Sequence, residues 1–264
     1  MKVTPVAERS DPRIAAYTHL TDVDYRLAHE AAESLFMAEG ELVIERVLRA
    51  GYAPRSALVS ERKLHRLEAV LRDRDVEVFV ADDEILATVT GYRVHRGALA
   101  AFIRPTPPTL EQVCASANFI VVLEDLVDHT NVGAIFRSAA ALGADAAVIS
   151  PRCADPLYRR ALKVSMGATA MLPWARAAAW PDAVRDLREM GFTCIGLTPS
   201  GDTTLRALGQ PTRPALLLGT EGTGLSHAAL SLTSVNARIE MANELDSLNV
   251  AAAAAVACYA LGSS

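Results

Sequence analysis

The 264-residue sequence lacks the cysteine and histidine patterns of a zinc site or a disulfide framework. Its four cysteines are too widely spaced for a CxxC pair, and its six histidines form no HxxxH cluster beside them. The N-terminus has no apolar leader segment, and the longest apolar run, residues 250–261, falls short of the roughly 20 residues that span a bilayer. We therefore expect a cytoplasmic protein with reduced thiols, no metal and no membrane segment.

The sequence also lacks an excess of positive charge. Its 31 acidic and 26 basic residues give a net charge of -5, which is a weak overall signature for a protein that binds a polyanion. Only the stretch 46–104 is net positive, with 11 basic and 8 acidic side chains. Arg62, Lys63 and Arg66 fall on or near one predicted helix in this stretch, so they are candidates for contacting a nucleic acid. A solvated charged face is the alternative interpretation.

Prolines mark a domain boundary in the segment RPTPPT, residues 104–109, because proline discourages both helix and central strand. Before it, residues 57–60 and 76–80 are predicted to be short buried strands, with a helix over 61–74 between them. We thus expect a smaller mixed α/β domain over 1–104, with a helical leader, and a larger domain over 105–264.

After the boundary, short β-rich runs alternate with helical stretches, and most of these runs are continuously apolar. Such alternation predicts an α/β fold in which parallel strands are joined by crossover helices and covered on both faces. The predicted strands are residues 119–126, 146–150, 192–198, 215–220 and 237–241.

Three segments place polar residues just beyond predicted strand ends, where open α/β sheets bind ligands. In the first, residues 129–144, a predicted helix is apolar almost everywhere except at Arg137. Burying an arginine there is costly unless it meets a partner or a ligand. A structural ion pair with a carboxylate is the alternative to a functional role.

The second segment, residues 216–226, is a strand that ends in three glycines around Glu221 with GxxGxG spacing. Glycine permits close backbone approach, so this loop could wrap a flat ligand; a plain tight turn is the alternative. In the third segment, residues 239–261, a strand runs through a polar turn into a helix. Asp246 or Ser247 could be its N-cap, which would leave Asn249 unexplained.

Together the three segments resemble the motifs of the SpoU (TrmH) family of RNA ribose 2'-O-methyltransferases, in the SPOUT superfamily. The first motif is matched by Asn131, Gly133, Ala134, Arg137 and Gly143. The second motif is matched by Gly219, Glu221, Gly224 and Leu225. The third motif is matched by Ile239, Met241, Ser247, Leu248, Asn249 and Val250. The resemblance covers roughly residues 118–261, and residues 163–168 also look like a family segment. Two positions depart from the pattern: His129-Thr130 replaces a proline-containing turn, and Glu240 replaces a common proline.

The resemblance implies a deep trefoil knot that holds S-adenosylmethionine, in a homodimer whose active sites lie at the two-fold interface. By resemblance the cofactor-binding residues are Leu197, Thr198, Leu218, Gly219, Glu221, Gly222, Ile239, Met241 and Leu248. The catalytic residues are Arg137, Asn131, Glu221, Ser247 and Asn249. Residues 1–104 would be the RNA substrate-binding domain, and ribosomal RNA the more expected substrate.

Three other interpretations stay open at this stage. A tRNA 2'-O-methyltransferase would share the motifs, and a non-catalytic RNA-binding protein could carry a methyltransferase-like domain. A nucleotide-dependent oxidoreductase would share the parallel sheet, but the sequence has no GxGxxG after the first predicted strand and no acidic residue at the matching distance.

Overall fold

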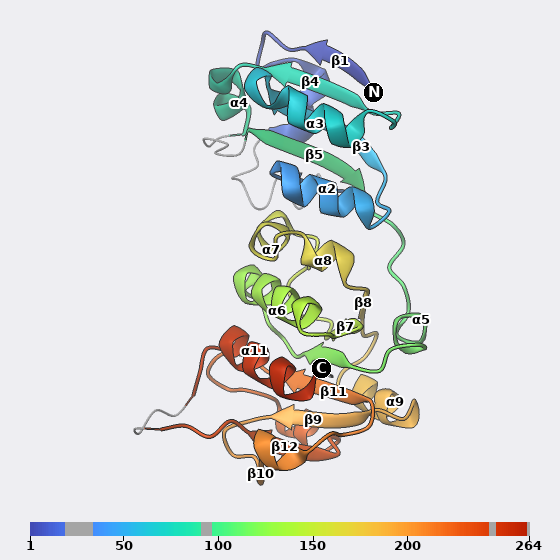
Figure 1. Ribbon diagram of the computed structural model, residues 1–264, viewed down its shortest axis with the longest axis vertical. Helices are drawn as coiled ribbons and strands as arrows, with labels where there is room; N and C mark the ends of the chain where they lie inside the picture. Colours follow the sequence, from blue (N-terminus) through green and yellow to red (C-terminus); the bar gives the residue numbers. More distant parts are fainter. Residues whose placement is uncertain (19–33, 91–96, 243–246, 263–264) are drawn as a thin grey trace. The chain divides into compact units, whose positions relative to one another are not determined.

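The computed structural model describes residues 1–18, 34–90, 97–242 and 247–262. The chain forms two compact units (Figure 1). The first unit contains residues 1–106 and 157–167, and the second contains residues 107–156 and 168–264. The predicted division at residue 104 therefore misses one feature, because residues 157–167 pack with the first unit although they come from the second half of the sequence.

The first unit is built on a five-stranded sheet with the order β1-β4-β3-β5-β2. Its strands are β1 (Lys2–Pro5), β2 (Leu35–Glu39), β3 (Pro54–Ser60), β4 (Glu77–Ala81) and β5 (Ala98–Ile103). Strands β1, β4 and β3 are parallel, whereas β5 runs antiparallel to both β3 and β2, so the sheet is mixed. The unit opens with β1, and the helical turn η1 follows it. Residues 19–33 lie outside the described residues, so the expected helical leader stays a prediction.

Helices and helical turns of the first unit are η1 (Pro12–Tyr17), α2 (Glu41–Arg49), η2 (Glu61–Lys63), α3 (Leu64–Leu71), α4 (Asp83–Thr90) and α7 (Arg159–Val164). Helix α7 is attached to the first unit by ion pairs. Glu39 at the end of β2 is only 2% exposed, and its carboxylate lies 2.6 Å from Lys163 Nζ and 3.7 Å from Arg159 Nη1. This buried ion-pair cluster explains why α7 belongs to the first unit.

The second unit is built on a seven-stranded sheet with the order β10-β12-β9-β11-β6-β7-β8, and all its strand pairs are parallel. Its strands are β6 (Ile120–Leu123), β7 (Ala146–Ile149), β8 (Trp174–Arg176), β9 (Thr193–Leu197), β10 (Thr203–Thr204), β11 (Pro214–Leu218) and β12 (Val235–Arg238). The predicted parallel-sheet α/β fold is thus confirmed. One strand prediction was misplaced, since β12 ends at Arg238 and residues 239–241 form a loop.

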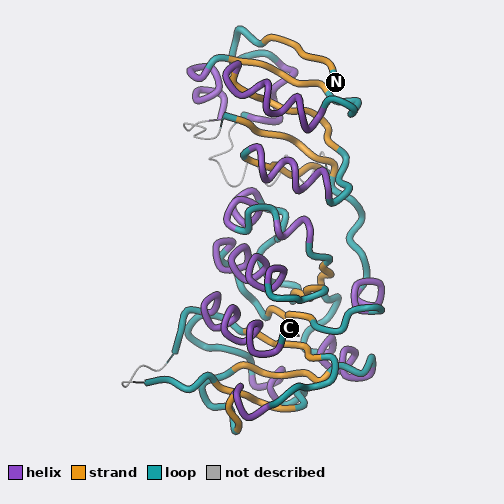
Figure 2. The backbone as a smooth tube through the Cα atoms, viewed as in Figure 1, coloured by secondary structure: helices purple, strands orange, loops and turns teal. Residues whose placement is uncertain are grey.

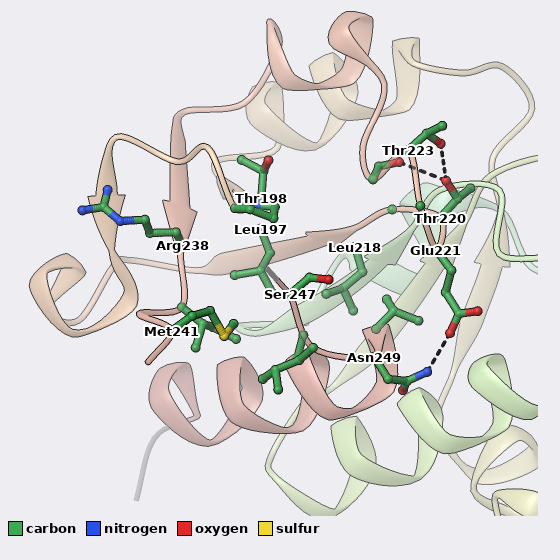
Figure 3. Close-up of a pocket in the computed structure, with 18 of the residues that line it drawn as sticks. Leu197, Thr198, Leu218, Thr220, Glu221, Thr223, Arg238, Met241, Ser247 and Asn249 are labelled. Carbon is green, nitrogen blue, oxygen red and sulfur yellow. Dashed lines mark hydrogen bonds between the residues drawn. The ribbon is translucent and has the colours of Figure 1, made fainter. Parts of the chain in front are cut away.

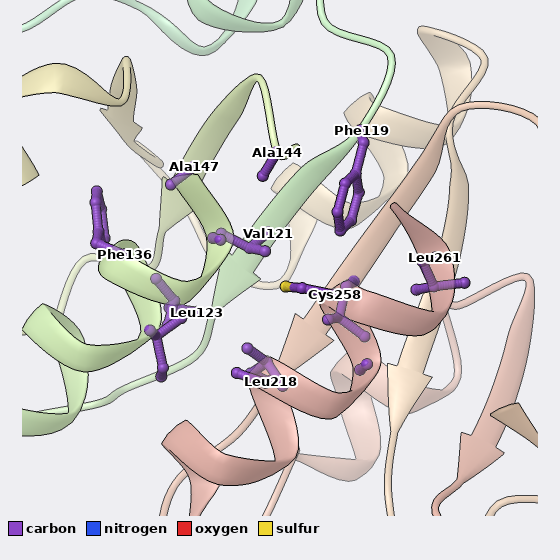
Figure 4. Close-up of a cluster of buried hydrophobic side chains, with 14 of the residues drawn as sticks. Phe119, Val121, Leu123, Phe136, Ala144, Ala147, Leu218, Cys258 and Leu261 are labelled. Carbon is purple, nitrogen blue, oxygen red and sulfur yellow. The ribbon is translucent and has the colours of Figure 1, made fainter. Parts of the chain in front are cut away.

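Helices cover both faces of this sheet (Figure 2). They are α5 (Leu110–Cys114), α6 (His129–Ala141), α8 (Ala168–Met171), α9 (Asp182–Glu189), η3 (Leu205–Leu208), α10 (His227–Leu230) and α11 (Val250–Leu261). Alternate residues of β6 point to opposite faces: Val121 and Leu123 join one buried cluster, and Ile120 and Val122 join the other. Figure 4 shows the first cluster, where α6 and α11 lie side by side over the strands.

The strand order brings three strand ends together. Strand β9 lies between β11 and β12, and all three run in the same direction, so their carboxyl ends meet at one edge of the sheet. The loops that follow these strands therefore become neighbours although they are far apart in the sequence. Within the described residues, no helix is long and apolar enough to cross a membrane.

Candidate active site

A cavity of about 920 Å³ opens where the loops after β9, β11 and β12 meet the start of α11 (Figure 3). Its walls come from residues 197–199, 218–224, 238–241 and 247–250, together with Ala253. The backbone fixes these loops to each other, because the Thr198 N–H donates to the Ala237 carbonyl at 2.9 Å. All nine residues proposed for cofactor binding line this one cavity: Leu197, Thr198, Leu218, Gly219, Glu221, Gly222, Ile239, Met241 and Leu248.

The glycine-rich loop after β11 forms one wall of the cavity. It closes on itself through two backbone hydrogen bonds between Thr220 and Gly224, both 3.1 Å long. A Cβ atom on Gly219 would lie 2.2 Å from the Gly224 carbonyl carbon, and Gly222 has a φ of 96°, so neither position suits a side chain. The loop is a tight turn, as the alternative interpretation held, and it is also a cavity wall.

Three of the proposed catalytic side chains meet at the edge of the cavity. The Asn131 side-chain amide donates to Glu221 Oε1 at 2.9 Å, and the Asn249 amide donates to the same oxygen at 2.6 Å. The two asparagines are also linked, because Asn249 Nδ2 lies 3.3 Å from Asn131 Oδ1. Asn131 is 8% exposed at the start of α6, whereas Glu221 is exposed. One carboxylate is thus oriented by two amides from two different helices.

Asn249 is also the N-cap of α11, because its side-chain oxygen accepts from the Ala251 and Ala252 N–H groups. The interpretation that Asp246 or Ser247 caps this helix was wrong. Ser247 is exposed and lines the cavity, and Asp246 lies outside the described residues. The capping bonds use the oxygen of Asn249 and leave its amide nitrogen to hold Glu221.

Arg137 does not line the cavity formed by its own chain. It lies on α6 six residues after Asn131, which corresponds to about 240° around a helix, and its side chain is exposed. The expectation that the Arg137 guanidinium is buried was therefore wrong, because α6 is apolar only on its inner face. Among the described residues Arg137 makes no hydrogen bond or ion pair, so the structural ion pair that we considered is also absent from that part of the chain.

Several lining residues were missed by the sequence analysis: Pro199, Thr220, Thr223, Arg238 and Ala253. Thr220 and Thr223 could have been found from their place inside the glycine-rich motif; their hydroxyls lie 2.6 Å apart. Arg238 donates to the Gly201 carbonyl at 2.5 Å, and Figure 3 shows its side chain pointing away from the other labelled residues.

The first departure from the family pattern leaves the start of α6 intact. Asp128 is the N-cap of α6 and accepts from the Thr130 N–H at 2.7 Å, which makes His129 the first helical residue. Proline is favoured at that position, so histidine there keeps the same helix start. The second departure places the carboxylate of Glu240 on the cavity wall, where it is exposed.

The loop between β6 and α6 is shaped by another carboxylate. Asp125 has a φ of 53°, accepts from Ser150 Oγ at 2.7 Å and forms an ion pair with Arg152. The hydrogen bond from Arg152 lowers the pKa of the Asp125 carboxyl, with a smaller contribution from Ser150. Among the described residues, no group of three or more histidine, cysteine or acidic side chains is arranged to hold a metal ion.

The sequence profile of the SpoU rRNA methylase family matches residues 118–259. A tRNA/rRNA methyltransferase of uncharacterised specificity from Mycobacterium tuberculosis is 40% identical over 98% of this chain and 91% of its own length. The 23S rRNA (guanosine(2553)-2'-O)-methyltransferase of Bacillus subtilis is 26% identical over 90% of this chain and 94% of its own length.

Two crystal structures share the fold. An rRNA methyltransferase from Sinorhizobium meliloti with bound AdoMet superposes with a TM-score of 0.84 at 24% identity, covering 98% of this chain and 97% of that one. The SpoU methyltransferase AviRb from Streptomyces viridochromogenes, also with AdoMet, gives a TM-score of 0.82 at 23% identity, covering 95% of this chain and 97% of that one. At these identities the likeness concerns the fold.

Proposed function

This chain belongs to the SpoU family of RNA methyltransferases in the SPOUT superfamily, and we propose that it transfers a methyl group from S-adenosylmethionine to a ribose 2'-hydroxyl of RNA. One observation carries the proposal. Asn131, Glu221 and Asn249 come from three separate segments, and they converge on the edge of a cavity lined by every residue proposed for cofactor binding.

The cavity residues fit S-adenosylmethionine. Apolar side chains of Leu197, Leu218 and Ile239 suit the adenine ring, and the glycine loop offers backbone groups without side chains to block them. The family relatives from Sinorhizobium and Streptomyces were crystallised with this cofactor. When bound, it supplies an electrophilic methyl group on a sulfonium.

The polar side chains would orient the ribose and stabilise the negative charge that develops on its 2'-oxygen. Glu221 Oε2 makes no hydrogen bond among the described residues, so it can accept one from the attacking 2'-hydroxyl while Oε1 stays fixed by the two amides. We assign Ser247, which lines the cavity, to contact with the ribose. Arg137 carries a planar guanidinium that donates hydrogen bonds and accepts none, so we assign it to the target phosphate or the developing alkoxide.

Because Arg137 lies outside its own cavity, the proposal requires the Arg137 of a second copy, and hence a homodimer. The outward face of α11 supports this, since Val256 is 45% exposed and Tyr259 is 79% exposed. Ala252 on the same face is small enough to allow close helix approach.

We expect the double variant V256D/Y259D to sediment as a monomer at micromolar concentration and to lose methyl transfer, because two carboxylates would have to be buried in the interface. V3D, which alters an apolar residue that is 42% exposed in the first unit, is the matched control and should remain dimeric. A wild-type monomer with full activity would refute this part of the proposal.

We further infer the deep trefoil knot of the superfamily. The strand order supports it: β11 lies between β6 and β9, β12 lies beyond β9, and α11 returns to pack on α6. Knots are rare in protein chains, so the inference depends on the family and not on general topology.

Ribosomal RNA is the proposed substrate and the cytoplasm the proposed location, with tRNA as the alternative. The named activity of the Bacillus relative favours ribosomal RNA. The first unit is proposed to bind this RNA, although its candidate cations already have acidic partners: Arg62 pairs with Asp83, and both Lys63 and Arg66 pair with Glu41.

The decisive experiment uses S-adenosylmethionine labelled in the methyl group and transcribed 16S rRNA, 23S rRNA and tRNA. We expect the label to enter ribosomal RNA at one linkage, and that linkage to resist alkali because hydrolysis needs a free 2'-hydroxyl. Label on a base would contradict the ribose assignment, and label on tRNA alone would select the alternative substrate. No transfer to any of the three RNAs would favour a non-catalytic RNA-binding protein.

A further inference from the structure

Glu124 is a buried carboxylate that follows β6 and that neither the family motifs nor the proposed mechanism uses. Its side chain is 3% exposed. Oε1 accepts from the indole N–H of Trp180 at 2.5 Å, and Oε2 accepts from the backbone N–H of Ser226 at 2.8 Å. Its own backbone N–H donates to the Leu218 carbonyl at 2.8 Å.

A carboxylate in this position is energetically demanding. Among the described residues Glu124 forms no ion pair, so two neutral N–H groups alone satisfy its charge. A buried apolar side chain would avoid the desolvation cost, but it would leave the Trp180 and Ser226 N–H groups without acceptors. The carboxylate therefore provides two hydrogen-bond acceptors, one for Trp180 and one for Ser226.

These contacts enclose the glycine-rich loop. Leu218 is the last residue of β11 before the loop, and Ser226 is the N-cap of α10 just after it. Glu124 thus holds the entry of the loop through its backbone and the exit through its side chain. The loop closes on itself through Thr220 and Gly224, and Glu124 ties both of its ends to the end of β6.

We propose that Glu124 is a positioning residue that sets the glycine-rich loop at the spacing required to bind S-adenosylmethionine. The inference rests on the proposed function, because it assumes that this cofactor occupies the cavity. Glu124 does not line the cavity itself, so it acts through the loop and not by contact with the ligand.

The variant E124Q separates shape from acceptor number. Glutamine has nearly the same volume, but its amide offers one acceptor and one donor, so either the Trp180 or the Ser226 N–H would face another N–H. We expect the dissociation constant for S-adenosylmethionine to rise about tenfold, as for one broken buried hydrogen bond. In the double variant E124Q/W180F the indole donor is gone, so the amide oxygen can turn to Ser226 and most of the affinity should return.

The control is D145N. Asp145 Oδ2 also accepts two backbone N–H groups, from Asn118 and Phe119, but at the opposite end of β6. Its loss should lower the melting temperature without changing cofactor affinity. Calorimetry with S-adenosylmethionine on the full-length proteins, with melting curves, distinguishes the cases. If E124Q does not fold, W180F alone tests the idea, because it leaves Oε1 without its donor and should weaken binding severalfold.

Wild-type protein that does not bind S-adenosylmethionine would overturn the proposed function. Wild-type protein that binds it, with E124Q or W180F binding equally well, would overturn the positioning role alone. The same result would follow if D145N lost as much affinity as E124Q, or if the double variant bound no better than E124Q.

Discussion

Two glutamates in each unit are satisfied in different ways. In the first unit Glu39 is paired with Lys163, and Glu41 with two further cations, so the charges largely cancel. In the second unit Glu221 and Glu124 accept, among the described residues, only from neutral N–H groups, which fix a carboxylate without cancelling its charge. The ion pairs of Glu39 and Glu41 therefore hold the first unit together, whereas the Glu221 carboxylate on the cavity wall remains free to interact with a ligand.

Among the variants that test this comparison, Arg137→Ala should have the largest effect on activity, because it removes the cation that we assign to the active site. We expect methyl transfer to fall at least about a hundredfold, as when a preorganised charge stabiliser is lost. The melting temperature should not change, since the side chain is exposed and makes no ion pair in the described part of the chain.

Single-turnover transfer and thermal melts measure both quantities. Arg137→Lys should also be severely impaired, because a single ammonium does not replace a planar two-donor fork. Full turnover in the Ala variant would show that Arg137 has no catalytic role. Unfolding of both variants would show that its role is structural.

Gly219→Val should have the next largest effect and acts on the cavity wall. The new side chain would strike the backbone of Gly224 and Leu225, both 2.2 Å from a Cβ, before it reached any ligand. Cofactor affinity measured by calorimetry should fall by at least about tenfold, while RNA affinity stays nearly constant. Gly209→Ala, at a position outside the cavity with nothing within 4 Å but a φ of 65° that strains any side chain, is the control for backbone strain away from the cavity. Normal cofactor affinity in the Val variant would count against this location of the pocket.

Glu221→Gln tests the charge itself. The amide oxygen can still accept from Asn131 and Asn249, so the shape of the cluster should persist and the melting temperature should hardly change. We expect kcat to fall about tenfold, with the KM for S-adenosylmethionine little affected, because only the charge that meets the ribose hydroxyl is lost. An unchanged kcat would mean that the carboxylate serves only to hold the two asparagines.

The smallest effect is expected from the triple variant R62A/K63A/R66A in the first unit. These cations form exposed or half-exposed pairs, which contribute about 0–1 kcal/mol each. The salt dependence of RNA affinity should flatten by less than about one unit per residue removed, since acidic partners already offset the charges. If RNA binding fell as much as methyl transfer falls in Arg137→Ala, these cations would be major RNA contacts despite their acidic partners.

The sequence predicted the second unit better than the first, for a physical reason. Strands buried on both faces are largely apolar runs, so β6, β7, β9 and β11 could be located before the structure was known, whereas the less buried β12 was misplaced. The edge strands β8 and β10 have three and two residues and carry no such run. The packing of residues 157–167 on the first unit depends on Glu39, more than a hundred positions away, and no local pattern encodes it.

The positions around the cavity were predictable because each motif follows directly after a strand, and parallel strands end at one edge. The exposure of Arg137 could also have been derived. Val132, Ile135, Phe136 and Ala139 mark the buried face of α6, and Arg137 lies off that face. The role of Glu124 could not be derived, because its partners Trp180 and Ser226 lie 56 and 102 positions away and are set by the tertiary fold alone.

The capping of α11 by Asn249 has a consequence for the order of events in the cell. Asn131 and Asn249 are 118 positions apart, so during translation the first leaves the ribosome long before the second. Until Asn249 has emerged and α11 has folded against α6, Glu221 has one of its two amide partners and the cavity lacks a wall. On the proposed function, a chain that has not yet been translated through α11 therefore lacks a complete cofactor site.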